Sequence, residues 1–180
     1  MTDQIEISPR LEQWANLAGY TLTPASATND GRPLFWSASG ETRLFIARRR
    51  EGWFVLTDSD RMESEGFVLA ASSIDTIEKY LFGRFGRYIR SARGLPRVGV
   101  STSANQQPPN FSIETRDFEG VERFALIDSD GSPVAISSAD MITATSELKK
   151  LALYLAATTD QIEASALDSE GRPLFNPGKS

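Results

Sequence analysis

The side chains that most often carry enzyme chemistry are missing from this sequence. Its 180 residues include no histidine and no cysteine. Histidine-dependent catalytic triads, metal sites built on paired histidines and thiolate nucleophiles are therefore excluded. Ser101, Thr102 and Ser103 form a group of hydroxyls with no activating base beside them in the sequence. A carboxylate pair of the kind that glycosidases use can be hidden among the 24 acidic residues, since spacing does not reveal it. A carboxylate-dependent enzyme stays an alternative without positive support.

One short acidic motif has the beginning of a calcium-binding loop. Asp128, Asp130 and Gly131 match its first positions. The full pattern also needs a further oxygen ligand two residues on and a glutamate at the twelfth position. Ser132 and Ala139 stand at those two places, so the match fails. We predict a hairpin turn at this motif, and we predict no metal site and no cofactor in the chain.

Two basic motifs satisfy anion-binding patterns only formally. The segment 83–86, GRFG, fits the GxxG backbone clamp of some RNA-binding domains, but its neighbours favour a helix. The segment 48–50 is a run of three arginines at a predicted hairpin turn, where like charges are usually solvated. The net charge of −5 also argues against nucleic acid as the main partner, because phosphate binding needs a basic surface. A protein partner fits this charge better.

The better candidate for a binding element is the polar segment 99–110, GVSTSANQQPPN. Amide side chains both donate and accept hydrogen bonds, so such a loop can imitate a polar small molecule inside another protein's cleft. Pro108 and Pro109 stiffen the end of the loop and lower the cost of ordering it on binding. The alternative is a plain linker between two halves of the chain. On the first interpretation, the contact residues are Thr102, Asn105, Gln106, Gln107 and Asn110.

An amphipathic helix over 72–94 is expected to organise the rest of the chain. Apolar residues recur along one side at helical spacing, namely Ile74, Ile77, Leu81, Phe85, Tyr88, Ile89 and Ala92. Ser73 can cap its start and Gly94 can end it. Four arginines, Arg84, Arg87, Arg90 and Arg93, are expected on the opposite, exposed side. Gly83 and Gly86 also fall on that polar side. They are either a tolerated pair on a solvated surface or a place where another backbone or a partner approaches closely.

The remaining elements alternate between strands and helices. Periodicity and turn residues predict strands over 20–23, 34–36, 43–49, 53–57, 67–70, 111–116, 123–127 and 134–136. They predict further helices over 8–19, 139–157 and 161–167. This arrangement indicates an α+β fold in which helices pack on an antiparallel sheet.

The two halves of the chain resemble each other. The segment 54–60, FVLTDSD, matches 124–130, FALIDSD, and GRPLF occurs at both 31–35 and 171–175. In each half the order is strand, Asp-Ser-Asp turn, strand, helix, which predicts two related β-β-α units that share one core. Chance similarity is the alternative. We expect a single domain over 1–180 with parts at about 1–98 and 111–180, joined by the polar loop.

Composition places the chain among globular proteins. Hydrophobic residues make up 40% and charged residues 24%. No apolar run approaches the ~18 residues that a membrane span needs. The first residues also lack the basic and apolar segments of a secretion signal. We therefore predict a cytoplasmic location.

The order of aromatic and glycine positions resembles that of a known family. The matching residues are Trp53-Phe-Val-Leu-Thr57, Arg61, Glu65-Gly-Phe67, Tyr80-Leu-Phe-Gly83, Phe85-Gly86, Ile89-Arg90-Ser91 and Leu95-Pro96. In these motifs the chain resembles immunity proteins of bacterial polymorphic-toxin systems. It is most similar to the antitoxins of the mycobacterial tuberculosis necrotizing toxin, an NAD glycohydrolase. The specific part spans about 32–98 and contains no catalytic signature.

The resemblance implies a cytoplasmic, non-catalytic antitoxin that binds its cognate toxin domain, in a 1:1 complex, and blocks the NAD site. It does not fix which residues touch the toxin, so the polar loop supplies the first candidates. Arg87 and Arg90 are secondary candidates, because an exposed arginine face can meet a carboxylate-rich rim. The alternative is a cytoplasmic module of similar α+β fold that resembles a secretion chaperone and forms homodimers.

Overall fold

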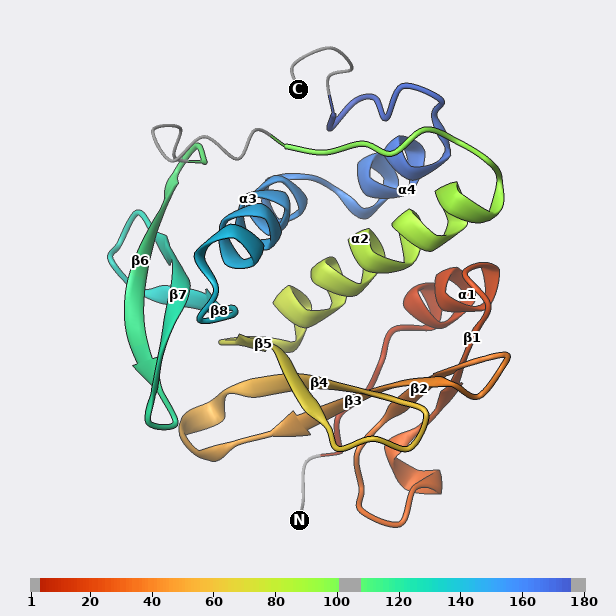
Figure 1. The fold of residues 1–180 in the computed structure, drawn as a ribbon, viewed down its shortest axis with the longest axis horizontal. Coiled ribbons are helices and arrows are strands. Elements are labelled where there is room, and N and C mark those ends of the chain that lie inside the picture. The colour runs from red at the N-terminus through yellow and green to blue at the C-terminus, as the bar shows by residue number, and fades with distance from the viewer. Residues whose placement is uncertain (1–3, 101–107, 176–180) are drawn as a thin grey trace.

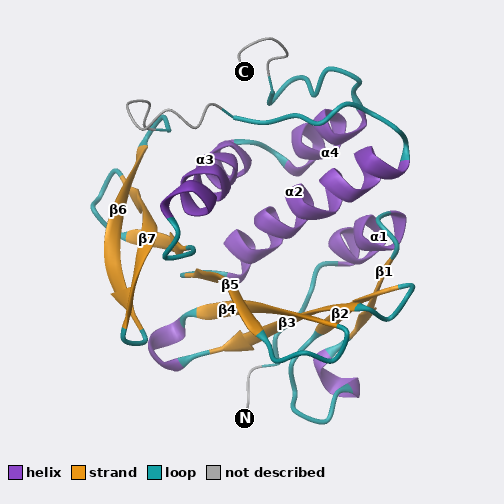
Figure 2. Cartoon of the chain, viewed as in Figure 1, coloured by secondary structure: helices purple, strands orange, loops and turns teal. Residues whose placement is uncertain are grey.

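The computed structural model describes residues 4–100 and 108–175. Within this part of the chain, four α-helices pack on an eight-stranded sheet (Figures 1 and 2). All neighbouring strands pair antiparallel. The predicted α+β class is therefore confirmed.

The elements of the first half are α1 (Pro9–Leu17), β1 (Tyr20–Thr23), β2 (Leu34–Ser37), β3 (Thr42–Arg48), β4 (Phe54–Asp60), β5 (Gly66–Ala71) and α2 (Ile74–Ala92). Those of the second half are β6 (Phe111–Phe118), β7 (Val121–Asp128), β8 (Pro133–Ile136), α3 (Met141–Ala156) and α4 (Thr159–Leu167). Short 3-10 turns occur at Ala25–Ala27 and Arg50–Gly52. The predicted elements agree with these bounds to within a few residues.

The local signals that set the helix ends are those expected from the sequence. The Ser73 side chain accepts a hydrogen bond from the Thr76 amide and so caps the start of α2. Beyond its end, Gly94 adopts a φ of +68°, a conformation that favours glycine. Helix α1 begins in the same way, with the Ser8 side chain accepting from the Leu11 amide.

The sheet has two parts joined by a short seam. The strand order is β1-β2-β3-β4-β5-β8-β7-β6, so β5 and β8 bring the two halves together. At this seam the register pairs Ala70 with Ile136 and Ala71 with Ala135. The sheet curves around α2, with the β6–β7 hairpin beside α3 and β2 to β4 below α2 (Figure 1). The helices lie on the inner side of this curve.

The order strand, strand, helix does occur twice, as β4, β5, α2 and as β7, β8, α3. The Asp-Ser-Asp motif, however, behaves differently in the two places. Asp128 forms the predicted turn, because its side chain accepts hydrogen bonds from the Asp130 and Ser132 amides. In the first half, residues 58–60 continue β4, and the turn follows at 61–62 with positive φ values. The Asp-Ser-Asp turn predicted there is wrong, and the relation between the two units stays a prediction.

Helix α2 is buried on two sides. On one side Phe85 packs against Tyr20 and Phe35, with ring centroids 5.1 and 5.3 Å away. On the other side Gly83 and Gly86 are buried beneath α3 and α4. The prediction that these glycines lie on a solvated face is wrong, because the C-terminal helices cover the side of α2 that looks polar in sequence.

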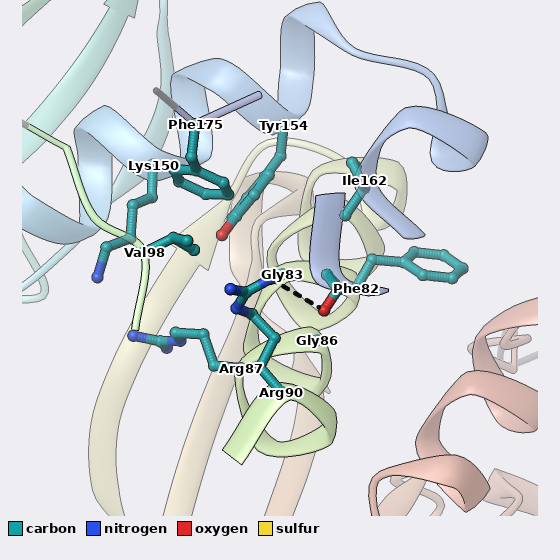
Figure 3. A pocket seen from close by; sticks show the side chains of 11 residues that line it. Phe82, Gly83, Gly86, Arg87, Arg90, Val98, Lys150, Tyr154, Ile162 and Phe175 are labelled. Carbon is teal, nitrogen blue, oxygen red and sulfur yellow. Dashed lines mark hydrogen bonds between the residues drawn. The ribbon is translucent and has the colours of Figure 1, made fainter. Parts of the chain in front are cut away.

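The two glycines allow this close approach. A Cβ atom at Gly83 would lie 2.1 Å from Cε2 of Tyr154 in α3. A Cβ atom at Gly86 would lie 2.9 Å from Cβ of Ala166 in α4. Figure 3 shows Tyr154 reaching across toward Gly83. The alternative of close approach is therefore confirmed, and the approaching elements belong to the same chain.

Arg90 also departs from its expected position. It was predicted to be exposed, yet it is 3% exposed. Its guanidinium donates to the carbonyl of Pro96 at 2.7 and 3.0 Å and also reaches carbonyls at the end of α4, those of Ser165, Ala166, Asp168 and Ser169. The last carbonyls of a helix have no partner within the helix, so Arg90 satisfies several of them at once. It thereby fixes both α4 and the segment after α2.

Replacing Gly83 with alanine tests the close approach. Alanine is favoured over glycine in a helix by ~1 kcal/mol, whereas overpacking a core costs ~1–3 kcal/mol. Because the new methyl group would collide with the ring of Tyr154, we expect Gly83→Ala to lower the free energy of unfolding in urea. Ser91→Ala, at an exposed position of the same helix, is the control and should leave stability unchanged or slightly raised. A stabilised Gly83→Ala protein would contradict the packing.

Replacing Arg90 with methionine removes the donors but keeps a long side chain. The carbonyls that it satisfies would lose their partners, which we expect to lower the free energy of unfolding by at least ~2 kcal/mol. Arg93→Met, at an exposed position directly after α2, should change it by less than ~0.5 kcal/mol. Equal effects of the two substitutions in thermal and urea unfolding would rule out the structural role of Arg90.

Candidate functional site

Most of the predicted contact residues of the polar loop, Thr102, Asn105, Gln106 and Gln107, lie outside the described residues. Asn110 is described and exposed. It has a φ of +65° in the turn before β6. The structure therefore places one predicted contact residue on the surface at the end of the loop.

Both ends of the loop are anchored in the core. Val98 and Val100 are partly buried against the main hydrophobic cluster. Pro108 is buried, and its carbonyl accepts a hydrogen bond from the Phe111 amide at 3.2 Å. Near the first end, the backbone of Gly171 lies so close to Val98 that a Cβ atom there would be 2.6 Å from Cγ1 of the valine. The loop therefore starts and ends at fixed points.

The arginines of α2 do not form one exposed face. Arg93 is exposed, and the side chain of Arg87 is 38% exposed. The Arg84 side chain is 12% exposed and lies 3.3 Å from a carboxylate oxygen of Asp58. Arg90 is enclosed by carbonyl groups, as described above. Of the two secondary candidates, Arg87 is accessible to a partner and Arg90 is not.

Arg84 and Arg87 line a groove of about 830 Å³ next to the seam. We call it the seam groove. Its other lining residues come from β4 and β5 (Asp58, Phe67, Val68), from α2 and the segment after it (Tyr80, Tyr88, Arg90, Ser91, Gly94, Leu95, Arg97, Val98), and from the region of β8 and α3 (Ser137, Ser138, Thr143, Glu147, Lys150).

The groove exists because the seam is short. Beyond the pair formed by Ala70 and Ile136, the chain after β8 stays with β7 instead of β5. The Ser137 amide donates to the Phe124 carbonyl at 2.8 Å, and the Phe124 amide donates to the Ser138 carbonyl at 3.1 Å. The two strands therefore separate at this point, and the groove opens between them.

Ion pairs link charged side chains inside the seam groove, but cationic side chains outnumber the carboxylates. Glu147 lies 3.1 Å from Arg87 and 3.6 Å from Lys150, so it serves two cations. Burial opposes ionisation of Glu147, but the charges of Arg87 and Lys150 outweigh it and lower the pKa of this carboxyl group. Burial likewise lowers the pKa of Lys150, against the opposing effect of Glu147. Apart from Arg90, four cationic side chains line the groove against two carboxylates.

The two carboxylates of the groove do not form the acid–base pair of an enzyme. Each is held by an arginine, Asp58 by Arg84 and Glu147 by Arg87. A general acid near neutral pH needs a raised pKa, whereas the pKa of Glu147 is lowered. Within residues 4–100 and 108–175, no group of three acidic side chains is placed to hold a metal ion. In the same part of the chain, no helix has both the length and the apolar character needed to cross a membrane.

A second hollow, of about 740 Å³, lies beside the arginine run 48–50. The three arginines are exposed, as predicted for a turn of like charges. Arg49 forms an ion pair with Glu119 at 3.6 Å, and Trp53 packs edge-on against Phe118 with centroids 5.6 Å apart. This hollow is lined by the charged side chains of the turn and by the apolar side chains of Trp53, Phe118, Pro133 and Ile136.

Sequence reasoning missed the contribution of α3 to the site. Glu147 and Lys150 lie three residues apart on a predicted helix, so the sequence indicates that they share one face of it. Their contact with Arg87 could not be predicted from the sequence, because it depends on how α3 crosses α2.

The comparisons with known proteins agree with the resemblance seen in the sequence. The model of the family described as Immunity protein 61 matches residues 14–174. The chain is 44% identical over 175 residues to the "Immunity factor for TNT" of Mycobacterium tuberculosis and to the "Immunity factor for TNT homolog" of Mycobacterium bovis, which covers 97% of this chain and 96% of each relative. The solved structure of Rv3902c from M. tuberculosis matches with a TM-score of 0.86 and 42% identity, covering 100% of this chain and 99% of that one.

These matches span nearly the whole length of the chain and of its relatives. The solved structure shares the fold, and the family model and both curated relatives are described as immunity proteins or immunity factors. The chain belongs to the Immunity protein 61 family and is an immunity protein, that is, an antitoxin.

Proposed function

We propose that this chain is the antitoxin of a toxin of the TNT kind and that it occludes the NAD site of that toxin. The toxin domain is an NAD glycohydrolase, the complex is 1:1, and it forms in the cytoplasm. The observation that supports this most strongly is the 44% identity, over nearly the full length of both chains, to a protein described as the immunity factor for TNT.

The proposed mechanism is steric. The polar loop enters the toxin's cleft and offers the amides of Asn105, Gln106 and Gln107 where NAD would offer its own polar groups. The anchored ends at Val98, Val100 and Pro108 support this role, because fixed stems reduce the entropy lost when the loop binds. Asn110, exposed at the end of the loop, contributes to the same contact.

Arg87 is the proposed contact beside the loop. Its guanidinium is partly exposed and already oriented by Glu147, so it can meet a carboxylate at the rim of the toxin's site. Arg90 has a different part in the proposal. It positions the beginning of the loop through the Pro96 carbonyl and makes no contact with the toxin.

The protein acts without catalysis in this proposal. The absence of histidine and cysteine supports it, as do the arginine partners of both carboxylates in the seam groove. A tight complex of this kind buries roughly 1,600 Å² or more. High affinity is required because one free toxin molecule can exhaust a metabolite pool catalytically.

Inhibition at one molar equivalent is the first test. A purified toxin domain of the TNT kind is mixed with increasing amounts of the chain, and the loss of NAD is measured. We expect activity to disappear at a 1:1 ratio, the mass of the complex in light scattering to equal one copy of each, and a non-hydrolysable NAD analogue to compete with the chain. In cells, co-expression should prevent killing by the toxin.

Other outcomes would contradict the proposal directly. A free homodimer that binds only partly unfolded toxin would indicate a chaperone. Binding that leaves NAD turnover intact would place the contact away from the NAD site, and turnover of NAD by the chain alone would make it an enzyme.

Substitutions in the polar loop test the contact itself. We expect the double substitution Gln106→Ala and Gln107→Ala to raise the inhibition constant at least ~10-fold, which corresponds to ~1.4 kcal/mol. Asn110→Gly should also weaken inhibition, since glycine keeps the positive φ but removes the amide. The matched control is Gln13→Ala with Asn16→Ala, at exposed positions of α1 on the other side of the molecule (Figure 1). If loop and control variants inhibit equally well, the toxin contact lies elsewhere.

A further inference from the structure

We propose that the seam groove binds the phosphoryl group of a small soluble molecule of nucleotide size. This site shares Arg87 with the contact proposed for the toxin, but the binding can be tested on the isolated chain without any toxin. Four features of the groove support it, namely its charge, its hydrogen-bond donors, its size and its rigidity.

The charge of the groove favours an anionic ligand. The chain as a whole carries a net charge of −5, yet the groove concentrates Arg84, Arg87, Arg97 and Lys150 against Asp58 and Glu147. A concave site with low-dielectric walls focuses such a field and raises the local concentration of anions. The excess of two positive charges matches the charge of a phosphate monoester near neutral pH.

The number and kind of hydrogen-bond donors in the groove suit a phosphoryl group. A phosphoryl group presents three oxygens that can accept hydrogen bonds, more than a single carboxylate does. Arginine forks suit this geometry, and lysine adds a compact charge. Hydroxyl groups of Tyr88, Ser91, Ser138 and Thr143 lie along the same lining. Donors therefore reach the groove from α2, from α3 and from the chain after β8.

The size of the groove suits a ligand larger than a single phosphate ion. At about 830 Å³, the groove is within the range of small-molecule sites, ~300–1,000 Å³, and much larger than a single phosphate ion requires. Its border includes aromatic side chains. Tyr88 is 37% exposed and its ring is held by stacking on Tyr20, with centroids 5.6 Å apart. Phe67 is half-buried on the other border. A base or sugar attached to the phosphoryl group has surfaces to pack against.

Ion pairs hold two arginines of the groove in place. Asp58 holds Arg84 at 3.3 Å, and Glu147 holds Arg87 at 3.1 Å, so both guanidinium groups are oriented before any ligand arrives. Side chains that are already in place lose little entropy on binding. The small cavity shown in Figure 3 borders the groove, and the two share Arg87, Arg90, Val98 and Lys150 as lining residues.

Binding of AMP by the full chain tests the proposal in the absence of any toxin. Isothermal titration and ³¹P NMR are performed with AMP, inorganic phosphate, adenosine and succinate at moderate salt. We expect saturable binding of AMP with a Kd below ~1 mM, weaker binding of inorganic phosphate, and at least ~10-fold weaker binding of adenosine. No saturable binding of AMP, or equal binding of AMP and adenosine, would overturn the proposal. Succinate binding as tightly as AMP would overturn the phosphoryl assignment.

Substitutions locate the site. Arg87→Gln and Lys150→Gln are each expected to raise the Kd of AMP at least ~10-fold. Arg93→Gln is the matched control, because this arginine lies directly after α2, outside the groove lining, and should leave the Kd unchanged. Circular dichroism establishes that each variant is folded, and the ligand comparison on the unaltered chain needs no variant. If all three variants bind AMP as the original chain does, the seam groove is not the site.

Discussion

The whole structure depends on how closely other helices approach α2. Because Gly83 and Gly86 carry no side chain, Tyr154 of α3 and Ala166 of α4 occupy the space next to the backbone of α2. On the opposite side, Phe85 packs into the aromatic cluster above the sheet. One helix therefore supports both the N-terminal strands and the C-terminal helices. Arg90 adds a polar counterpart to this packing by holding the end of α4 and the start of the polar loop through backbone carbonyls.

The sequence allowed the elements to be predicted well and their contacts poorly. Helix caps, turn residues and periodicity are local signals, so α1, α2 and the strands were found near their true bounds. The burial of Gly83, Gly86 and Arg90 depends on α3 and α4, which lie far away in the sequence. An arginine on the polar side of a helix looks the same in sequence whether it meets water or a set of carbonyls. The seam groove was missed for a similar reason, because it arises where two distant strands separate.

The family assignment and the structure complement each other. The matched family describes immunity proteins, and the architecture supplies a stable framework with a loop anchored at both ends. The residues that made the resemblance recognisable serve mostly that framework. Tyr80, Gly83, Phe85, Gly86 and Arg90 are all buried residues of α2. The matching residues therefore serve mainly to pack helices together. For this reason they identified the family but did not reveal the binding residues.

The short seam between β5 and β8 has a consequence for the shape that a partner meets. Two residue pairs do little to fix the angle between the two parts of the sheet, so that angle is set mainly by the helices packed inside the curve. Because α3 contacts β6 and β7, we expect a change of volume at Tyr154 to alter the position of that hairpin relative to β2 and β3. Relatives with identical surface residues can therefore differ in the curvature they present to a toxin, and specificity between homologous pairs can evolve at positions that no partner touches.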